Sequence, residues 1–127
     1  MEEALKAAAQ ARVNAYAPYS GFKVGAALRA ESGKLYTGCN VENASFGATI
    51  CAERGAMMSA VASGERKFRS LLVVTEAEPP AMPCALCLQV LSEFCSPDMP
   101  VYTATPGEVV GEILLRDLLP HPFTEVP

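Results

Sequence analysis

The sequence predicts an α/β protein with three α/β/α layers, in which helices cover both faces of a mixed five-stranded sheet. Helix-like and strand-like patterns follow one another along the chain in the order αββαβαββ. The run Leu71–Val74 is apolar without interruption, which is typical of a strand covered on both faces. With 127 residues, half of them hydrophobic, the chain suits one core, so we expect a single domain over residues 1–127.

The N-terminal part predicts a helix and then a β-hairpin. Residues 2–15 are rich in good helix formers and carry a modest apolar stripe, formed by Leu5, Ala9, Val13 and Tyr16. From Phe22 to Leu28 every second residue is apolar, which predicts a half-buried strand. A turn at 31–33 and a second strand over 34–40 complete the hairpin.

The middle of the chain predicts a loop, a helix and a buried strand. Residues 41–48 form the loop, and Thr49 is a plausible N-cap for a helix over 50–63. Gly64 is the expected C-terminal stop of this helix. The strand that contains the apolar run covers residues 68–75.

Prolines divide the last part of the chain into short elements. A Pro-rich loop over 76–83 precedes a helix over 84–95, whose apolar side carries Cys84, Cys87, Leu91 and either Phe94 or Cys95. Strands follow over 101–105 and 109–114. A short turn at 117–119 and a loose tail end the chain.

Composition excludes several classes of function. The net charge of −4 argues against a nucleic-acid partner, because such proteins carry a basic excess. No segment offers the roughly 20 apolar residues of a membrane span, and the acidic N-terminus does not resemble a secretory signal. We therefore expect a cytoplasmic protein without a membrane partner. In that compartment, an odd number of cysteines, five, favours metal binding or catalysis over disulfides.

Two cysteine motifs predict a zinc site. Cys84 and Cys87 follow Pro83 at the start of a predicted helix, where a spacing of three puts both sulfurs on one side. Cys51 lies in the first turn of another predicted helix, with Glu53 two residues later. Helix N-termini favour thiolates, and three thiolate ligands leave the fourth position of Zn²⁺ open, as catalysis requires.

The residues beside the cysteines suggest the chemistry. A carboxylate close to zinc that is not a ligand can carry protons, and Glu53 suits this role. Zinc deaminases combine a Cys-x-Glu or His-x-Glu with a downstream Pro-Cys-x-x-Cys, the order found here. Arg54 is placed to donate hydrogen bonds to a thiolate and offset the negative charge of the site.

Other interpretations use the same cysteines differently. A structural zinc module would close a four-sulfur site with Cys39, leaving Glu53 as a surface charge. A thiol redox protein would use Cys84 and Cys87 without metal. Cys39 and Cys95 otherwise suit core positions, and we expect the single histidine, His121, to lie on the surface.

Beyond the zinc motifs, nearly the whole chain resembles the small homotetrameric cytidine deaminases of pyrimidine salvage. The matching segments are Ala15–Ser20 (AYAPYS), Phe22–Ala27 (FKVGAA), Gly38–Ala44 (GCNVENA), and Leu118–Pro120 with Phe123. The third segment is the most specific, because it separates nucleoside deaminases from polynucleotide-editing relatives. Departures from the family pattern include Leu88 in place of arginine and Phe46 in place of tyrosine.

The resemblance implies a function and a set of site residues. It implies the cytidine-deaminase-like fold and the zinc-dependent hydrolysis of cytidine and 2'-deoxycytidine to uridine and 2'-deoxyuridine, with release of ammonia. Deaminases of an antibiotic or of deoxycytidylate are alternatives, although no basic cluster for a phosphate is evident. One Zn²⁺ per subunit would be held by Cys51, Cys84 and Cys87, with Glu53 as the catalytic proton shuttle.

The resemblance also implies how the nucleoside is bound. Phe22 would lie against the base, the backbone at Ala52 would bind the pyrimidine, and Asn40 and Glu42 would bind the ribose hydroxyls. Neighbouring subunits of a homotetramer would complete each pocket through Ala44, Phe46 and Phe123.

Overall fold

The structure is a computed structural model and describes residues 1–126 of the chain. Its five strands form one sheet in the order β2-β1-β3-β4-β5, with the central pair β3 and β4 parallel and the other pairs antiparallel. The elements follow the predicted order and are α1 (Glu2–Val13), β1 (Gly25–Ala30), β2 (Leu35–Cys39), the 3₁₀ helix η1 (Phe46–Ala48), α2 (Ala52–Ala62), β3 (Phe68–Val74), α3 (Ala85–Phe94), β4 (Pro100–Ala104), β5 (Val109–Leu114) and α4 (Leu115–Leu118).

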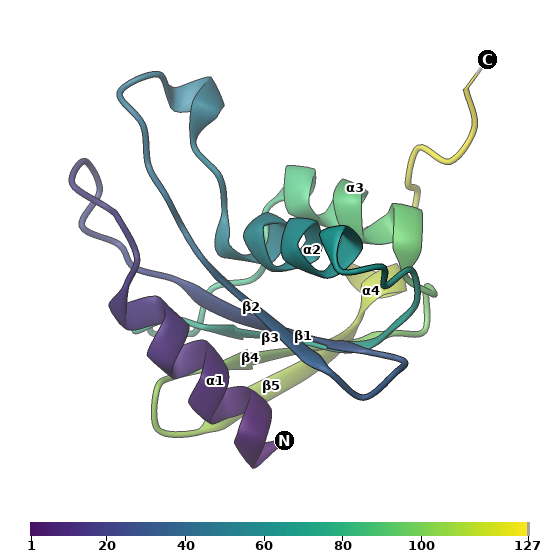
Figure 1. The fold of residues 1–127 in the computed structure, drawn as a ribbon, viewed down its shortest axis with the longest axis horizontal. Helices are drawn as coiled ribbons and strands as arrows, with labels where there is room; N and C mark the ends of the chain where they lie inside the picture. Colours follow the sequence, from purple (N-terminus) through teal and green to yellow (C-terminus); the bar gives the residue numbers. More distant parts are fainter. Residues whose placement is uncertain (127) are drawn as a thin grey trace.

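The helices lie on both faces of the sheet, which confirms the three-layer prediction (Figure 1). Helix α1 covers one face, where Ala4 and Ala8 join a small apolar core. Helices α2 and α3 cover the other face over a larger core that includes Met57 and Leu91. In the described part of the chain, no helix has the length and apolar composition that crossing a membrane requires.

Strand β1 is buried on both faces, so the prediction of a half-buried strand starting at Phe22 is wrong. Ala26 and Leu28 face the larger core, whereas Ala27 faces α1. The strand starts only at Gly25, where a Cβ atom would lie 2.0 Å from the carbonyl oxygen of Ala8. Helix α1 thus approaches the sheet closely at a glycine, and the residues before Gly25 leave the sheet.

The buried face of α1 differs from the predicted stripe. Leu5 and Ala9 pack at the edge of the small core, but Val13 and Tyr16 are exposed. The fully covered positions are Ala4 and Ala8, whose small side chains let the helix lie close to the sheet. Because α1 ends at Val13, Tyr16 no longer follows its helical period.

Helix α2 starts at Ala52 with Cys51 as its N-cap, so the prediction of Thr49 as the cap is wrong. Val41 and Ile50 exchange both backbone hydrogen bonds (2.9 and 3.0 Å), which keeps the chain extended up to Ile50. At the other end, Gly64 adopts a positive φ of 97° just after the helix, as predicted. The delayed start places Cys51 at the end of the helix instead of inside it.

Glycine also sets how closely α2 approaches the sheet. A Cβ atom on Gly38 of β2 would lie 2.3 Å from the carbonyl oxygen of Ala52 and 2.5 Å from the backbone nitrogen of Ala56. The first turn of α2 therefore rests directly on the backbone of β2. This contact fixes where the residues at the start of α2 lie relative to the sheet.

Candidate active site

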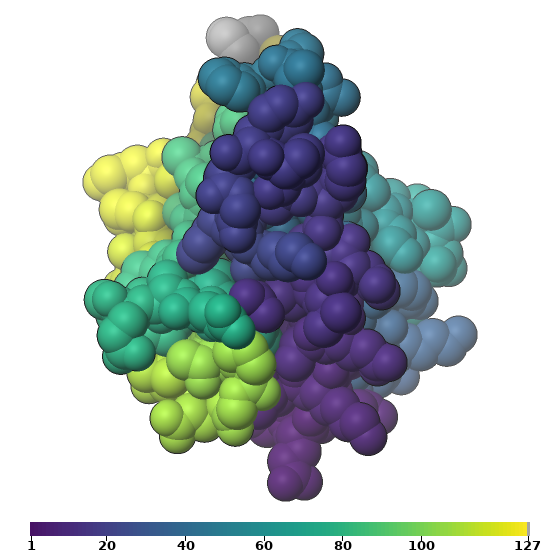
Figure 2. Space-filling model, turned by 90° about the vertical axis from the view of Figure 1, so that its left-hand side faces the viewer, coloured from purple at the N-terminus to yellow at the C-terminus, as the bar shows by residue number. Residues whose placement is uncertain are grey.

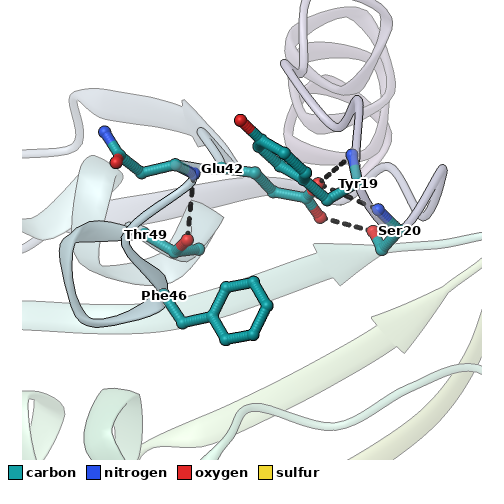
Figure 3. Close-up of a pocket in the computed structure, with 6 residues that line it drawn as sticks. Tyr19, Ser20, Glu42, Phe46 and Thr49 are labelled. Atoms are coloured by element: carbon teal, nitrogen blue, oxygen red, sulfur yellow. Dashed lines mark hydrogen bonds between the residues drawn. The ribbon is translucent and has the colours of Figure 1, made fainter.

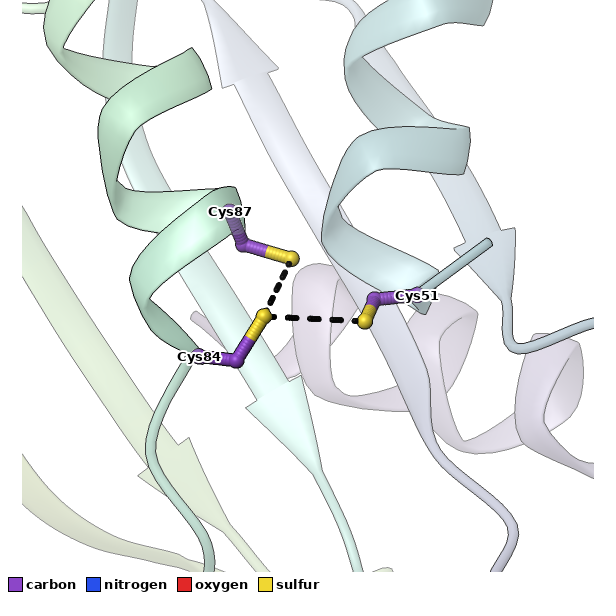
Figure 4. Close-up of side chains that lie close together, drawn as sticks. All are labelled: Cys51, Cys84 and Cys87. Atoms are coloured by element: carbon purple, nitrogen blue, oxygen red, sulfur yellow. Dashed lines mark hydrogen bonds between the residues drawn. The ribbon is translucent and has the colours of Figure 1, made fainter. Parts of the chain in front are cut away.

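Three cysteines come together at the starts of two neighbouring helices. Cys51 is the N-cap of α2, Cys84 is the N-cap of α3, and Cys87 lies in the first turn of α3. The Sγ atoms of Cys51 and Cys84 are 3.7 Å apart, and those of Cys84 and Cys87 are 3.4 Å apart (Figure 4). Sulfurs bound tetrahedrally to one Zn²⁺ at about 2.3 Å lie roughly 3.8 Å from one another, so the arrangement fits zinc.

Within residues 1–126, this cluster contains these three cysteines and no other potential ligand. Cys39 lies outside it on the edge strand β2, so the alternative of a closed four-sulfur site is wrong. Cys95 is buried at the far end of α3, and His121 is exposed, both as expected. A site with three sulfurs leaves one position of a tetrahedral metal open.

The thiols of the cluster differ in acidity. Contact with the Cys87 thiol, together with the guanidinium of Arg54, lowers the pKa of Cys51 to about 5. The same contact, together with burial, raises the pKa of Cys87. The Nη2 atom of Arg54 lies 3.4 Å from both the Sγ atom of Cys51 and the carbonyl oxygen of Thr49. Arg54 thus faces the cysteine whose pKa is lowered.

Glu53 is a buried acid beside the cluster. Its side chain is 5% exposed, and burial raises its pKa to about 7, with a further contribution from the negative charge of Cys51. A carboxyl group that binds and releases a proton near neutrality is suited to general acid–base catalysis. Glu53 does not belong to the sulfur cluster, so it is a neighbour of the candidate metal ligands and not one of them.

A pocket of about 250 Å³ joins these groups to the segment before β1 and the loop after β2. This is slightly below the range of roughly 300–1,000 Å³ typical of small-molecule pockets. Cys51, Glu53 and Cys84 line one side, whereas Cys87 lies buried behind them. Four of the predicted substrate-binding residues also line it: Phe22, Asn40, Glu42 and Ala52.

Asn40 fixes the backbone next to Phe22. Its Nδ2 atom donates to the carbonyl oxygen of Phe22 and its Oδ1 atom accepts from the backbone N–H of Val24, both at 2.8 Å. The side chain is buried, and these two bonds leave it one further N–H and one further lone pair. The segment that departs from the sheet before Gly25 is therefore held by the side-chain amide of the residue that follows β2.

Glu42 holds the same segment, the connection 14–24 between α1 and β1, at a second point. Its Oε1 atom accepts hydrogen bonds from the backbone N–H groups of Tyr19 (2.9 Å) and Ser20 (3.0 Å), and its Oε2 atom accepts from the Ser20 hydroxyl (Figure 3). These hydrogen bonds lower the pKa of Glu42, and the bond from the Ser20 hydroxyl contributes most. The Ser20 hydroxyl also accepts from the N–H of Phe22 at 3.0 Å. In the space-filling view, residues 14–24 (dark purple) lie against the loop that follows β2 (blue, Figure 2).

The pocket also contains residues that the sequence reasoning did not select. Thr75 is fully buried, and its hydroxyl accepts from the N–H groups of Ala77 (3.3 Å) and Ala81 (3.2 Å), which draws the following loop to the pocket wall. Met82 lies on that loop and lines the pocket. Ser20 belongs to the AYAPYS segment, whose match to the family pattern could have identified it as a pocket residue. No local pattern in the sequence marks Thr75 or Met82.

Three predicted substrate-binding residues lie outside this pocket. Ala44 and Phe46 are exposed on the 41–49 loop, where the Phe46 ring borders a separate, more open hollow of about 390 Å³. Phe123 is 63% exposed on the C-terminal tail. Their predicted role is in the pocket of a neighbouring subunit, so it stays a prediction.

The fold and the site together define a class: a zinc-dependent hydrolase of the deaminase type. Residues 1–103 match the family model described as the cytidine and deoxycytidylate deaminase zinc-binding region. The chain belongs to this family, as the sequence motifs predict. Membership of a zinc-binding family also favours zinc over the thiol redox interpretation of Cys84 and Cys87.

Individual relatives support the same assignment. The chain is 45% identical to a cytidine deaminase of Sporosarcina psychrophila over 98% of this chain and 92% of the relative. It is 44% identical to one of Halalkalibacterium halodurans, over 94% and 91% of the two chains. The crystal structure of a cytidine deaminase from Burkholderia pseudomallei superimposes with a TM-score of 0.89 at 47% identity, covering 96% of this chain and 98% of that one.

Proposed function

We propose that this protein hydrolyses cytidine and 2'-deoxycytidine to uridine and 2'-deoxyuridine with release of ammonia, as a step of pyrimidine salvage. The observation that carries the proposal is a buried carboxyl group, Glu53, in one small pocket with the three-cysteine cluster. The relatives named cytidine deaminase support the choice of substrate.

In this proposal Cys51, Cys84 and Cys87 hold one Zn²⁺ per subunit. When bound, zinc supplies a Lewis acid that makes a water molecule nucleophilic near neutral pH. Three thiolates give the site a net negative charge, which weakens this effect. Arg54, whose Nη2 atom faces Cys51, offsets part of that charge, as do the N-termini of α2 and α3.

Glu53 moves the protons of the reaction. Its carboxylate accepts a proton from the attacking water and delivers it to N3 of the pyrimidine, which makes C4 electrophilic. It then takes the remaining proton of the hydroxyl that has added to C4 and passes it to the exocyclic amino group, which leaves C4 as ammonia while the added oxygen becomes the carbonyl of uridine. A carboxyl group buried enough to have its pKa raised to about 7 exists in both protonation states at neutral pH, as this shuttle needs.

The other pocket residues orient the nucleoside. We propose that the ring of Phe22 packs against the face of the base. The backbone at Ala52, at the start of α2, would form hydrogen bonds with the polar edge of the base. Asn40 and Glu42 bind the ribose hydroxyls with the hydrogen-bonding capacity that their contacts to the loops leave free.

We further propose that the chain works as a single domain and as a cytoplasmic homotetramer, with no nucleic-acid or membrane partner. The exposed rings of Phe46 and Phe123 support assembly, because large apolar side chains at a surface favour burial by a partner. Ala44, Phe46 and Phe123 would then complete the pockets of neighbouring subunits.

The test is turnover by the zinc-loaded protein together with its Glu53→Gln variant. We expect the wild type to release uridine and ammonia from cytidine, and Glu53→Gln to lose turnover while keeping one zinc per chain. Glu93→Gln, an exposed glutamate on α3, is the matched control and should behave as the wild type. Substantial activity in Glu53→Gln would refute the proposed shuttle, and an inactive wild type would refute the substrate.

A further inference from the structure

One side chain of the body makes the hydrogen bonds to the C-terminal tail. After α4 the chain forms no further helix or strand up to residue 126, and the tail rises past one end of α3 and away from the body (Figure 1). The Nε2 atom of Gln89 donates to the carbonyl oxygen of Phe123 at 2.7 Å, and the N–H of Phe123 donates to the Oε1 atom of Gln89 at 3.1 Å. Within the described chain, these are the hydrogen bonds that residues 120–126 make.

A primary amide is well suited to this contact. It places one donor and one acceptor side by side, matching the carbonyl and N–H of a single extended residue. Pro120 and Pro122 have no N–H to donate and restrict the backbone just before Phe123. The tail therefore cannot form a regular ladder there, and Gln89 supplies the pairing that a neighbouring strand would otherwise give.

The residues on either side of Phe123 face the protein. Pro122 and Thr124 line a cavity of about 240 Å³ together with Ser92, Leu115 and Leu119. The side chain of Phe123 between them is 63% exposed and does not line the cysteine pocket of its own chain. The backbone of Phe123 is thus fixed while its ring is held away from the body.

We infer that Gln89 is a positioning residue, which fixes the tail so that Phe123 enters the substrate pocket of a second copy of this chain. The inference rests on the proposed function, in which Phe123 completes a neighbouring pocket. Gln89 lies two residues after Cys87 on α3, so the position of the tail is set by the helix that carries two of the clustered cysteines. One helix would then serve the pocket of its own chain and, through Phe123, that of a neighbour.

The test is a double-mutant cycle with Gln89→Glu and Phe123→Ala, measured as KM and kcat for cytidine on the zinc-loaded protein. Glutamate keeps the size of the side chain but sets a carboxylate against the Phe123 carbonyl. The N–H of Phe123 can still donate to a carboxylate oxygen, but the bond to the Phe123 carbonyl is replaced by repulsion, which should raise KM about tenfold, with kcat within about twofold of the wild type. In the Phe123→Ala background, Gln89→Glu should have no further effect, because the group that it positions is absent.

Glu93→Gln, on the same helix, controls for a general disturbance of α3, and the zinc content of every variant should stay at the wild-type value. An active wild type whose KM is unchanged by Gln89→Glu overturns the inference alone. So does a Gln89→Glu effect that persists in the Phe123→Ala background or that comes with loss of zinc. A wild type that does not deaminate cytidine overturns the proposed function, and this inference with it.

Discussion

The two sides of the pocket are held in place by different forces. On the cysteine side, Cys51 and Cys84 cap helices that are anchored in the larger apolar core. On the loop side, Asn40 and Glu42 hold extended segments almost entirely through hydrogen bonds to backbone groups. The cysteine side thus depends on packing, which is stiff and cooperative, and the loop side depends on a few individual polar contacts.

This difference predicts separate failures. Damage to the cysteine side should remove the metal and with it all turnover. Damage to the loop side should leave the metal in place and weaken substrate binding. Zinc content and KM, measured together on each variant, separate the two.

The largest effect is expected from Cys87→Ser on the cysteine side. A neutral hydroxyl is a much poorer zinc ligand than a thiolate, so the variant should lose most of its zinc at purification. We expect kcat/KM for cytidine to fall by more than about a thousandfold. Metal analysis and a cytidine assay measure both quantities.

Cys39→Ala is the matched control, because Cys39 lies outside the cluster on the half-buried edge strand β2. It should keep one zinc per chain and near-normal turnover. A Cys87→Ser protein that retains zinc and activity would show that Cys87 is not a ligand.

A smaller but still large effect is expected from Gly38→Ala, which acts on the support of the cysteine side. The new Cβ atom would meet the backbone of α2 at 2.3 Å, and backbone cannot move aside as a flexible side chain does. The start of α2 must shift, so the free energy of unfolding should fall by about 3 kcal/mol, the cost of a severe overpacking. Zinc affinity should fall as well, because Cys51 moves with the helix.

Gly47→Ala is the control for this variant, since a Cβ atom there meets nothing within 4 Å. Denaturant unfolding and competition with a chelator measure stability and zinc affinity. If Gly38→Ala matches Gly47→Ala in both, the close contact between α2 and β2 does not fix the cysteine side.

The sequence predicted the cysteine side far better than the loop side, and the reason is the distance along the chain. The spacings of Cys84 and Cys87, and of Cys51 and Glu53, are local, so helix geometry alone suggests where these side chains lie. The bonds from Asn40 to residues 22–24 span at least 16 positions, and a single sequence does not record such pairs. The same holds for Thr75, which reaches the pocket only because β3 ends there.

The errors in the fold have the same origin. Thr49 is a good N-cap by residue type, but the pairing of Val41 with Ile50 keeps the chain extended past it. Every second residue after Phe22 is indeed apolar, which predicts one exposed face. Helix α1 covers that face of β1 as well, so the strand is buried on both faces. In both cases a contact between distant segments overrode a valid local preference.

The smallest of these effects, and the one that defines the loop side, is expected from Asn40→Ala. The substitution leaves the carbonyl of Phe22 and the N–H of Val24 without partners next to a buried position, so the free energy of unfolding should fall by about 2 kcal/mol. Phe22 should lose its fixed place, which raises KM for cytidine while the zinc content stays unchanged. Asn43→Ala, an exposed amide on the adjoining loop, should change KM much less. Because Asn40 and the cysteines line one pocket but rest on different supports, loss of zinc in Asn40→Ala would mean that the two sides fold as one unit and do not fail separately.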